Sequence, residues 1–174
     1  LRVLAGKAEK RDGITSVPVE LWSRASGNAH GAQDAKTPPA EELHARAEIL
    51  LLSRLPEPGH TQGDPAIREY PKTIAEVYSE VLFHGPALHS LERVEGCSEA
   101  GIVAFAKAAP EPAAWMSEPL RGTWLSDPLA LDAAFQMMIL WSVERYRAGS
   151  LPCTAGRYRQ FRRNFPQDGV RIVI

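Results

Sequence analysis

The chain has 174 residues, 44% of them hydrophobic, which suffices for one ordinary domain or two very small ones. Its 20 basic and 21 acidic residues nearly cancel, so no overall charge attracts nucleic acid or an anionic membrane. No apolar stretch reaches the roughly 20 residues that cross a bilayer, and two cysteines are too few for a disulfide framework or a zinc site. We therefore expect a soluble cytoplasmic protein that binds neither nucleic acid nor membranes.

Two strands are predicted in the first third of the chain. Residues 14–23 (ITSVPVELWS) and 42–53 (ELHARAEILLLS) alternate apolar and polar residues or run apolar with β-branched members. An Asp-Gly turn signal stands directly before the first of them. Segments rich in Pro, Gly, Asn and Asp follow each strand, at 24–41 and 54–71. An antiparallel sheet is the expected product, and the second loop segment is expected to link two structural halves.

The remaining short elements are a helix, a hairpin and two strands. Residues 72–82 (KTIAEVYSEVL) place Ile74, Val77, Tyr78 and Val81 on one side at spacings of three and four, which predicts a short amphipathic helix. Residues 89–97 (HSLERVEGC) and 100–109 (AGIVAFAKAA) are typical of a hairpin. Further strands are predicted at 154–163 (TAGRYRQFRR), where Arg and aromatic residues alternate, and at 169–174 (GVRIVI).

The segment DPLALDAAFQMMILW, residues 127–141, predicts a long buried helix. Its Asp-Pro start suits a capping residue and the first helical position, and a glycine at 149 suits the end near 147. Apolar residues occupy nearly every side of the first half, which predicts that protein surrounds it. Asp132 and Gln136 lie one turn apart and project from the same face.

The residues alone leave two interpretations of this polar pair. A buried carboxylate needs a hydrogen-bond partner, and a glutamine amide one turn later is a suitable donor. Alternatively, Asp132 binds a loop backbone while Gln136 faces solvent.

The motif LDAAFQ on a helix surrounded by an antiparallel sheet resembles the dehydratase domains of polyketide and polyunsaturated-fatty-acid synthases. These domains carry Asp-x-x-x-Gln (or His) on the central helix of a hot-dog fold. VLFHGPALHSL, residues 81–91, is similar to the family's Tyr-Gly-Pro-x-Phe segment. LPCTAGRYRQFR, at 151–162, resembles the strand after the central helix, and ELHARAEILL, at 42–51, resembles a His-Ala-x-Gly stretch. The segments occur in the family's order over nearly the whole chain.

The resemblance implies an α+β double hot-dog fold, in which an antiparallel sheet wraps around a long central helix and the first half is incomplete. Residues 1–53 are then the remaining strands of the first hot-dog, and residues 54–71 form the linker. Residues 72–174 make the second hot-dog, with its central helix near 128–147.

The resemblance also implies a reaction, the removal of water from a 3-hydroxyacyl chain on acyl carrier protein to give a trans-2-enoyl thioester. The catalytic pair is then Asp132, which protonates or orients the leaving hydroxyl, and Gln136, which holds it. Expected substrate-binding residues are Phe83, His84, Gly85, Pro86, Leu151 and Pro152. No metal or cofactor is expected, because the phosphopantetheine arm of the carrier protein holds the substrate. Expected partners are the carrier protein and other synthase domains, with a homodimer left open.

The chain departs from the family at its histidines. The family's base lies in His-x-x-x-Gly-x-x-x-x-Pro, and none of the five histidines fits this motif. We therefore expect the chain to begin after the motif and to be inactive alone. His84 stands at the family's tyrosine position, with a simple capping role as the alternative. His44 is expected to be structural, and His30 and His60 to lie in loops.

Two other functions remain open on the sequence. One is a catalytically silent dehydratase-like module that shapes the synthase or docks the carrier protein. The other is a product-template domain, which uses the same fold to direct polyketide cyclisation.

Overall fold

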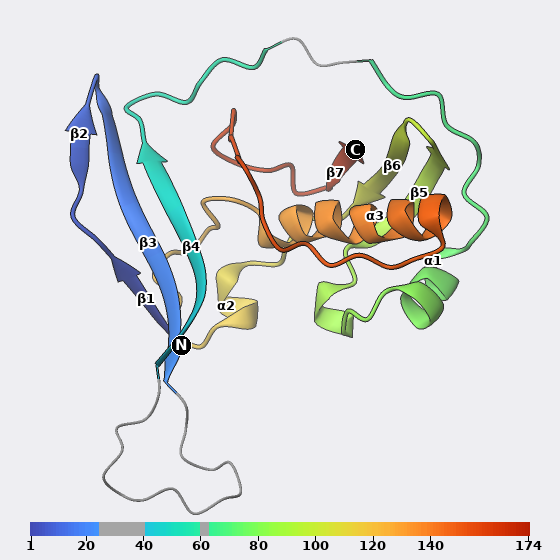
Figure 1. Cartoon of the computed structure of the whole chain (residues 1–174), viewed down its shortest axis with the longest axis horizontal. Coiled ribbons are helices and arrows are strands. Elements are labelled where there is room, and N and C mark those ends of the chain that lie inside the picture. Colours follow the sequence, from blue (N-terminus) through green and yellow to red (C-terminus); the bar gives the residue numbers. More distant parts are fainter. Residues whose placement is uncertain (25–40, 60–62) are drawn as a thin grey trace, which may run out of the picture. The chain divides into compact units, whose positions relative to one another are not determined.

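A computed structural model describes residues 1–24, 41–59 and 63–174. They divide into two compact units, Leu1–Leu55 and Pro56–Ile174, and each is considered by itself. Both units are built on antiparallel sheets (Figure 1). The loop expected at 24–41 lies almost entirely outside the described residues, and so do His30 and His60.

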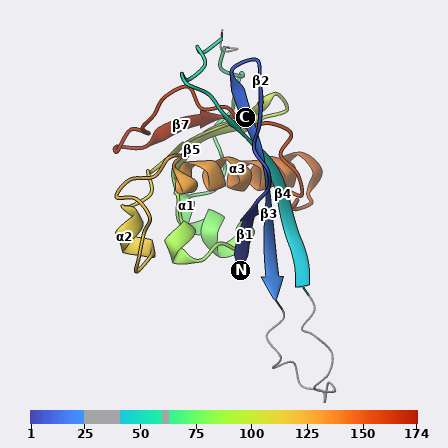
Figure 2. The ribbon, with the colours of Figure 1, turned by 90° about the vertical axis from the view of Figure 1, so that its left-hand side faces the viewer.

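The first unit is a sheet centred on β3 (Ile14–Arg24). Strand β4 (Glu41–Leu51) pairs antiparallel along one edge of β3, and Figure 2 shows the two side by side. The other edge of β3 is shared by β1 (Arg2–Ala5) and β2 (Glu9–Arg11). The two long strands confirm the strand predictions for this part of the chain, whereas the two short ones were not predicted.

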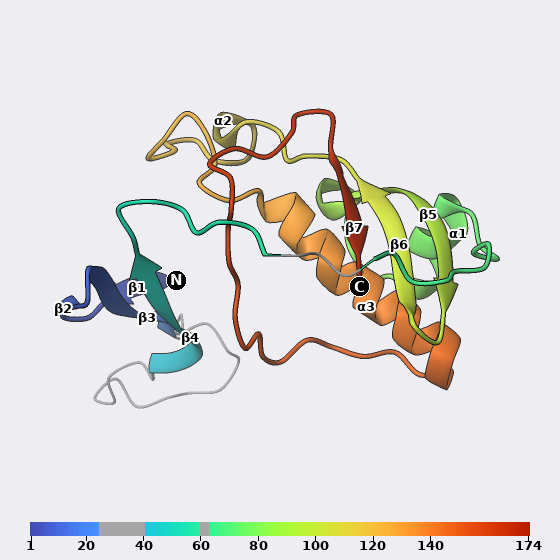
Figure 3. The same cartoon turned by 90° about the horizontal axis from the view of Figure 1, so that it is seen from above.

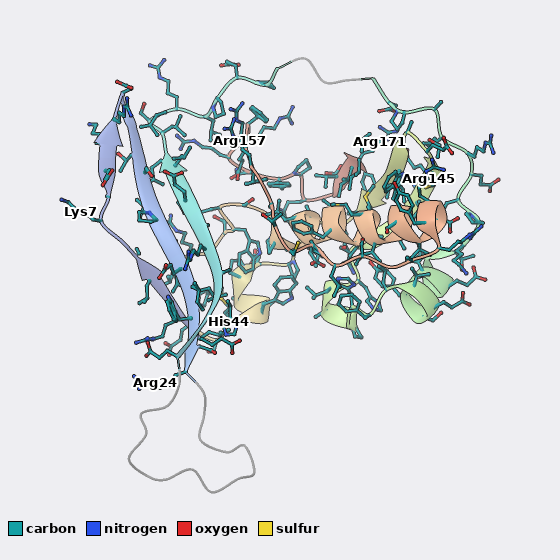
Figure 4. All side chains as sticks on the ribbon, in the orientation of Figure 1. Lys7, Arg24, His44, Arg145, Arg157 and Arg171 are labelled. Carbon is teal, nitrogen blue, oxygen red and sulfur yellow. The ribbon has the colours of Figure 1, made fainter. Side chains whose placement is uncertain are left out.

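Two local irregularities shape this sheet. Asp12 and Gly13 both have positive φ, 51° and 79°, which makes the tight turn that the Asp-Gly pair predicted. On β4, the register passes from Leu43 to Ala45 against consecutive residues of β3, so His44 is left over as the extra residue of a bulge. His44 is exposed on the strand (Figure 4).

Alternation and register give the sheet of the first unit two unlike faces, because directly paired residues share a face. One face carries the ion pair between Arg46 and Glu20, at 3.7 Å, and a hydrogen bond from Ser16 to Glu48. The opposite face is formed by Val3, Ala5, Val17, Val19, Leu21, Ala45, Ala47 and Ile49. None of the described residues of this unit is fully buried.

The second unit places a three-stranded sheet against one long helix. Strands β5 (Leu91–Ser98), β6 (Gly101–Ala106) and β7 (Val170–Val173) follow in that order, all antiparallel. Helix α3 (Pro128–Tyr146) packs against β6 and β5, as Figure 3 shows from above. The predicted hairpin and final strand are therefore present.

Helix α3 starts where its sequence predicts. The Asp127 carboxylate accepts hydrogen bonds from the amides of Ala130 and Ala109, both at 2.8 Å. At the other end, Arg147 itself adopts the left-handed conformation, with φ 55°, so the stop does not need the glycine at 149. The expectation that protein surrounds the helix is wrong in this structure, because Met138 is 45% exposed.

The hydrophobic core of the second unit lies between α3, the sheet and the segment before it. Met137 and Leu140 of α3 are fully buried against Ile102 of β6. Tyr70 and Leu82 belong to the same cluster, although they precede the sheet in sequence. This core fixes the helix face that carries Gln136.

The segment at 72–82 is helical, but not as one regular amphipathic helix. A short α1 (Ile74–Glu76) begins with a capping box, in which the Glu76 side chain accepts a hydrogen bond from the Thr73 amide at 2.7 Å. It passes directly into a π-helical turn, Val77–Val81, in which the Leu82 amide donates to the Val77 carbonyl at 2.9 Å. π-helical turns are rare in proteins, and those that occur are often found at functional sites.

The strand predicted at 154–163 is wrong, because this segment is irregular. Both edges of β6 are occupied by β5 and β7, and in the described residues the segment does not pair with the outer edge of either of these strands. The Gln160 side chain instead donates to the carbonyls of Leu125 and Arg162, at 2.7 and 2.6 Å, which competes with ladder formation. The other helix here is the short α2 (Pro112–Trp115). Within the described ranges, no helix is both long and apolar enough to span a membrane.

Candidate functional site

The polar pair on α3 is directly hydrogen-bonded. Gln136 Nε2 donates to Asp132 Oδ2 at 2.6 Å, as the one-turn spacing allows. Gln136 is completely buried, whereas the Asp132 side chain keeps 29% of its surface exposed. Of the two interpretations open from the residues, the structure has the direct contact and not a solvent-facing glutamine.

The Gln136 amide uses all of its hydrogen-bonding groups except one lone pair. Its second N–H donates to the Leu88 carbonyl at 2.8 Å, and its Oε1 accepts from the Tyr78 hydroxyl at 2.8 Å. With two donors and one acceptor engaged, a fully buried amide of this kind has a single favourable orientation.

Tyr78 joins the site from the π-helical turn. Its hydroxyl accepts from the Leu91 amide at 2.8 Å while donating to Gln136. Its ring stacks on His89, with centroids 3.9 Å apart and an interplanar angle of 15°. Burial raises the pKa of the Tyr78 hydroxyl above its ordinary value, so the hydroxyl stays protonated and can donate a hydrogen bond.

His84 approaches the same carboxylate from the loop after the π-helical turn. Its Nε2 lies 3.7 Å from Asp132 Oδ2, and its side chain is only 7% exposed. That separation is too long for a hydrogen bond but short enough for a charge interaction when the ring is protonated. Among the described residues, its buried Nδ1 has no hydrogen-bond partner. A simple capping role does not fit, because Gly85 occupies the cap position of the following 3-10 turn.

The loop around His84 is held by a second histidine. His89 Nε2 donates to the His84 carbonyl at 2.9 Å. Phe83 stacks on the His84 ring, with centroids 4.5 Å apart, yet is 71% exposed. Gly85 and Pro86 are exposed at the start of the 3-10 turn Pro86–Leu88.

The other two predicted substrate residues, Leu151 and Pro152, lie in a different segment of the chain. Leu151 and Pro152 follow the C-terminal end of α3, and both are exposed. The structure thus brings His84, Asp132 and Gln136 together, whereas Leu151 and Pro152 remain predicted substrate residues without a described contact to this group.

Two hollows lie on the surface of the second unit, and neither includes the Asp132 carboxylate. One, of about 340 Å³, is beside the second half of α3 and is lined by Ala100, Gly101, Met138, Trp141, Ser142, Ser150 and Ile174. The other, of about 350 Å³, is formed by the irregular segment 158–170.

Sequence reasoning missed Tyr78 as a site residue and placed it only on the apolar side of a helix. The structure confirms that side, since Ile74, Val77, Tyr78 and Val81 all contact the core. A signal was nevertheless present, because a tyrosine on an apolar helix face usually finds a hydrogen-bond partner for its hydroxyl. The partner could not be named, because Gln136 is 58 residues away in sequence.

Chemically, the arrangement provides a carboxyl group with one oxygen held and one oxygen open. Asp132 Oδ2 accepts from Gln136, so Oδ1 is the oxygen available to carry or deliver a proton. A carboxyl group beside an imidazole, on a partly exposed face, is suited to general acid–base chemistry.

Comparison with known proteins relates the chain to a fatty-acid synthase. It is 34% identical over 125 residues to a polyunsaturated fatty acid synthase subunit from a Thraustochytrium species. The match covers 71% of this chain but only 4% of that protein's length. No protein-family model matches the chain, and no solved structure matches it significantly. The chain is thus similar to one short segment of a polyunsaturated fatty acid synthase, which supports a domain of the fatty-acid and polyketide synthase type.

Proposed function

We propose that the chain is part of a dehydratase domain, which removes water from a 3-hydroxyacyl group on acyl carrier protein and yields a trans-2-enoyl thioester. The observation that carries this proposal is the Asp132 carboxyl group, held by the buried Gln136 amide at 2.6 Å. The similarity to a polyunsaturated fatty acid synthase supports the substrate class, an acyl thioester.

In the substrate, the reaction breaks the C2–H and C3–O bonds and forms one π bond, while the base gains a proton and the acid gives one to the departing water. A base takes the C2 proton, the electron pair of that C–H bond forms the C2–C3 double bond, and the C3 hydroxyl leaves. Hydroxide is a poor leaving group, so Asp132 delivers a proton from Oδ1 and the group departs as water. A positioned acid of this kind contributes about 10²- to 10⁴-fold in rate.

The base belongs to the histidine motif of the dehydratase family, which no histidine of this chain matches. His84, 3.7 Å from Asp132, is proposed as a wall of the site that keeps a polar group beside the carboxyl. The other proposed substrate contacts are Phe83, Gly85, Pro86, Leu151 and Pro152.

The proposal needs no bound metal or cofactor, since the carrier protein's phosphopantetheine arm presents the thioester. Acyl carrier protein and neighbouring synthase domains are the partners that this function requires, and the cytoplasm is the compartment in which we expect them to meet.

A catalytically silent dehydratase-like module is the second candidate. The two candidates differ in the His-x-x-x-Gly-x-x-x-x-Pro motif, which an active dehydratase requires elsewhere in the full-length protein and a silent module does not. Such a module keeps the hydrogen-bonded Asp132 only as a structural element of the fold.

The deciding experiment measures enoyl thioester formation by the full-length protein with 3-hydroxyacyl carrier-protein substrates. Asp132→Asn is expected to lower turnover by at least about 10², the lower range for losing a general acid. Asp168→Asn, at an exposed turn, is the matched control and is expected to keep wild-type turnover. Near-normal turnover by a folded Asp132→Asn protein overturns the acid role. A wild-type protein that leaves short, medium and long acyl chains unchanged favours the silent module.

A further inference from the structure

We propose that Tyr78 is a positioning residue, which orients the Gln136 amide so that its NH₂ group faces Asp132. The inference rests on the proposed role of Asp132 and deepens it by naming what sets the geometry of the acid. Two main-chain groups in this network, the Leu91 amide and the Leu88 carbonyl, have hydrogen-bonding roles that cannot change.

The direction of every hydrogen bond in this network follows from those two groups. The Leu91 amide can only donate, so the Tyr78 oxygen accepts from it and the single hydroxyl proton remains for Gln136 Oε1. At the other end the Leu88 carbonyl can only accept, so it requires the NH₂ side of Gln136. The Leu88 carbonyl and Asp132 Oδ2 thus set the side to which the NH₂ group points, and the Tyr78 hydroxyl is the donor that holds the buried Oε1 in this orientation.

Removing the Tyr78 hydroxyl removes the hydrogen bond to Gln136 Oε1. Gln136 Oε1 then stays buried without a donor, because the residue is fully enclosed. A flipped amide is no remedy, since it turns the oxygen toward the Leu88 carbonyl and the Asp132 carboxylate, which are both acceptors. The amide is expected to become mobile, and the carboxyl group of Asp132 with it.

Tyr78 also supports the loop that carries His84. Its ring stacks on His89 at 3.9 Å, and His89 holds the His84 carbonyl at 2.9 Å. One side chain thus contacts both the Gln136–Asp132 pair through its hydroxyl and the His84 loop through its ring. The π-helical turn Val77–Val81 is the local irregularity that presents it.

The alternative is that Tyr78 only fills space beside the core. Tyr78→Phe separates the two roles, because it keeps the ring and the His89 stack and deletes only the hydroxyl. Tyr146→Phe is the matched control: its ring is 62% exposed and meets Trp141 edge-on, away from the network.

The first test is NMR of the 174-residue chain with ¹⁵N-labelled glutamine side chains. In Tyr78→Phe, hydrogen exchange of the Gln136 NH₂ group is expected to accelerate about tenfold, which corresponds to one lost hydrogen bond. Tyr146→Phe is expected to leave it unchanged. Unchanged exchange in a folded Tyr78→Phe protein overturns the proposal.

If Tyr78→Phe does not fold, 3-fluorotyrosine at position 78 replaces it. This residue keeps the shape of tyrosine and changes the acidity of its hydroxyl. With the same ¹⁵N label, the Gln136 NH₂ resonances are then expected to shift relative to the protein with ordinary tyrosine at position 78, and a failure to shift overturns the proposal.

The second test is kinetic and uses the full-length protein. Tyr78→Phe is expected to lower kcat about tenfold at unchanged KM, since it loosens the acid without touching the acyl chain. If Gln136 exchange accelerates but no variant or wild type dehydrates, the positioning role stands and the proposed function fails. If dehydration depends on Asp132 while Tyr78→Phe changes neither exchange nor kcat, the function stands and this inference fails.

Discussion

The two units of the chain use the same kind of sheet with opposite results. In Leu1–Leu55, a sheet with one apolar face has no fully buried residue among those described. In Pro56–Ile174, a sheet of similar pairing carries α3, and Ile102, Val103 and Ala104 of β6 are completely buried. Alternation of apolar residues is therefore enough to specify a sheet, but a core needs a second layer.

The contrast also locates the candidate site. A buried amide such as Gln136 has a fixed orientation only because helix, sheet and loop enclose it on every side. The first unit offers no comparable enclosure among its described residues, and its polar groups form exposed ion pairs. Chemistry that depends on a fixed side-chain orientation is therefore expected in the second unit.

The largest expected difference is in backbone hydrogen exchange. Amides of β6 at 102–104 are expected to exchange only through global unfolding, which at about 5 kcal/mol or more slows them by roughly 10³-fold or more. Amides of β4 at 45–49 are expected to exchange through local opening. Hydrogen-exchange mass spectrometry measures both in one sample. Equal protection of β4 and β6 breaks the comparison, because it requires a cover over the apolar face of the first unit.

The next largest effect is a matched pair of leucine truncations. Leu140→Ala removes a side chain with no exposed surface, and is expected to cost about 2–5 kcal/mol in the free energy of unfolding. Leu50→Ala makes the same change at a residue that is 51% exposed, and is expected to cost less than about 1 kcal/mol. Urea titration followed by circular dichroism measures both. Similar costs at the two positions contradict the distinction between the units.

The smallest effect concerns the ion pairs of Arg171, a residue that is labelled in Figure 4. Its guanidinium lies 2.8 Å from both Glu95 and Asp64 and holds the pKa of each carboxyl below its usual value. A lowered pKa gives stability that is present above the unfolded values, 4.5 and 3.8, and is lost as pH falls through the folded values. Stability of the second unit is therefore expected to fall below about pH 4.5.

Arg171→Met isolates that contribution. The difference in stability between wild type and variant is expected to be largest near neutral pH and to shrink in acid. Arg157→Met, on the irregular segment after α3, is the control and is expected to keep the wild-type pH profile (Figure 4). Thermal unfolding at several pH values gives the comparison. A constant difference at all pH values contradicts the linkage.

Much of the fold could be predicted where the signal is local. Asp127 and Pro128 set the start of α3 by capping and by backbone angle, and Asp12 with Gly13 set a turn. The segment at 154–163 shows where this fails: its alternating side chains are those of a strand, but a strand forms only where the fold brings a free sheet edge beside the segment. Which edges are free is a property of the assembled sheet, and no local pattern contains it.

The candidate site divides in the same way. The contact between Asp132 and Gln136 follows from a spacing of four on a helix, and His84 was reached through the resemblance of its segment. Tyr78 and the main-chain groups of Leu88 and Leu91 were not, because their contacts depend on how a π-helical turn packs against a distant helix. Main-chain hydrogen-bond partners cannot be predicted from residue type, because nearly every residue has the same amide and carbonyl groups.

The buried carboxylate of Asp127 has a consequence for how this chain tolerates change. By binding Ala109 as well as Ala130, it closes the excursion 110–126 at its base, and the Trp124 indole adds a second closure to the Pro110 carbonyl at 2.7 Å. The cost of closing a loop grows only slowly with its length. We therefore expect that residues inserted or removed within 110–126 leave the start of α3 in place, because the hydrogen bonds of Asp127 hold it independently of the length of this excursion.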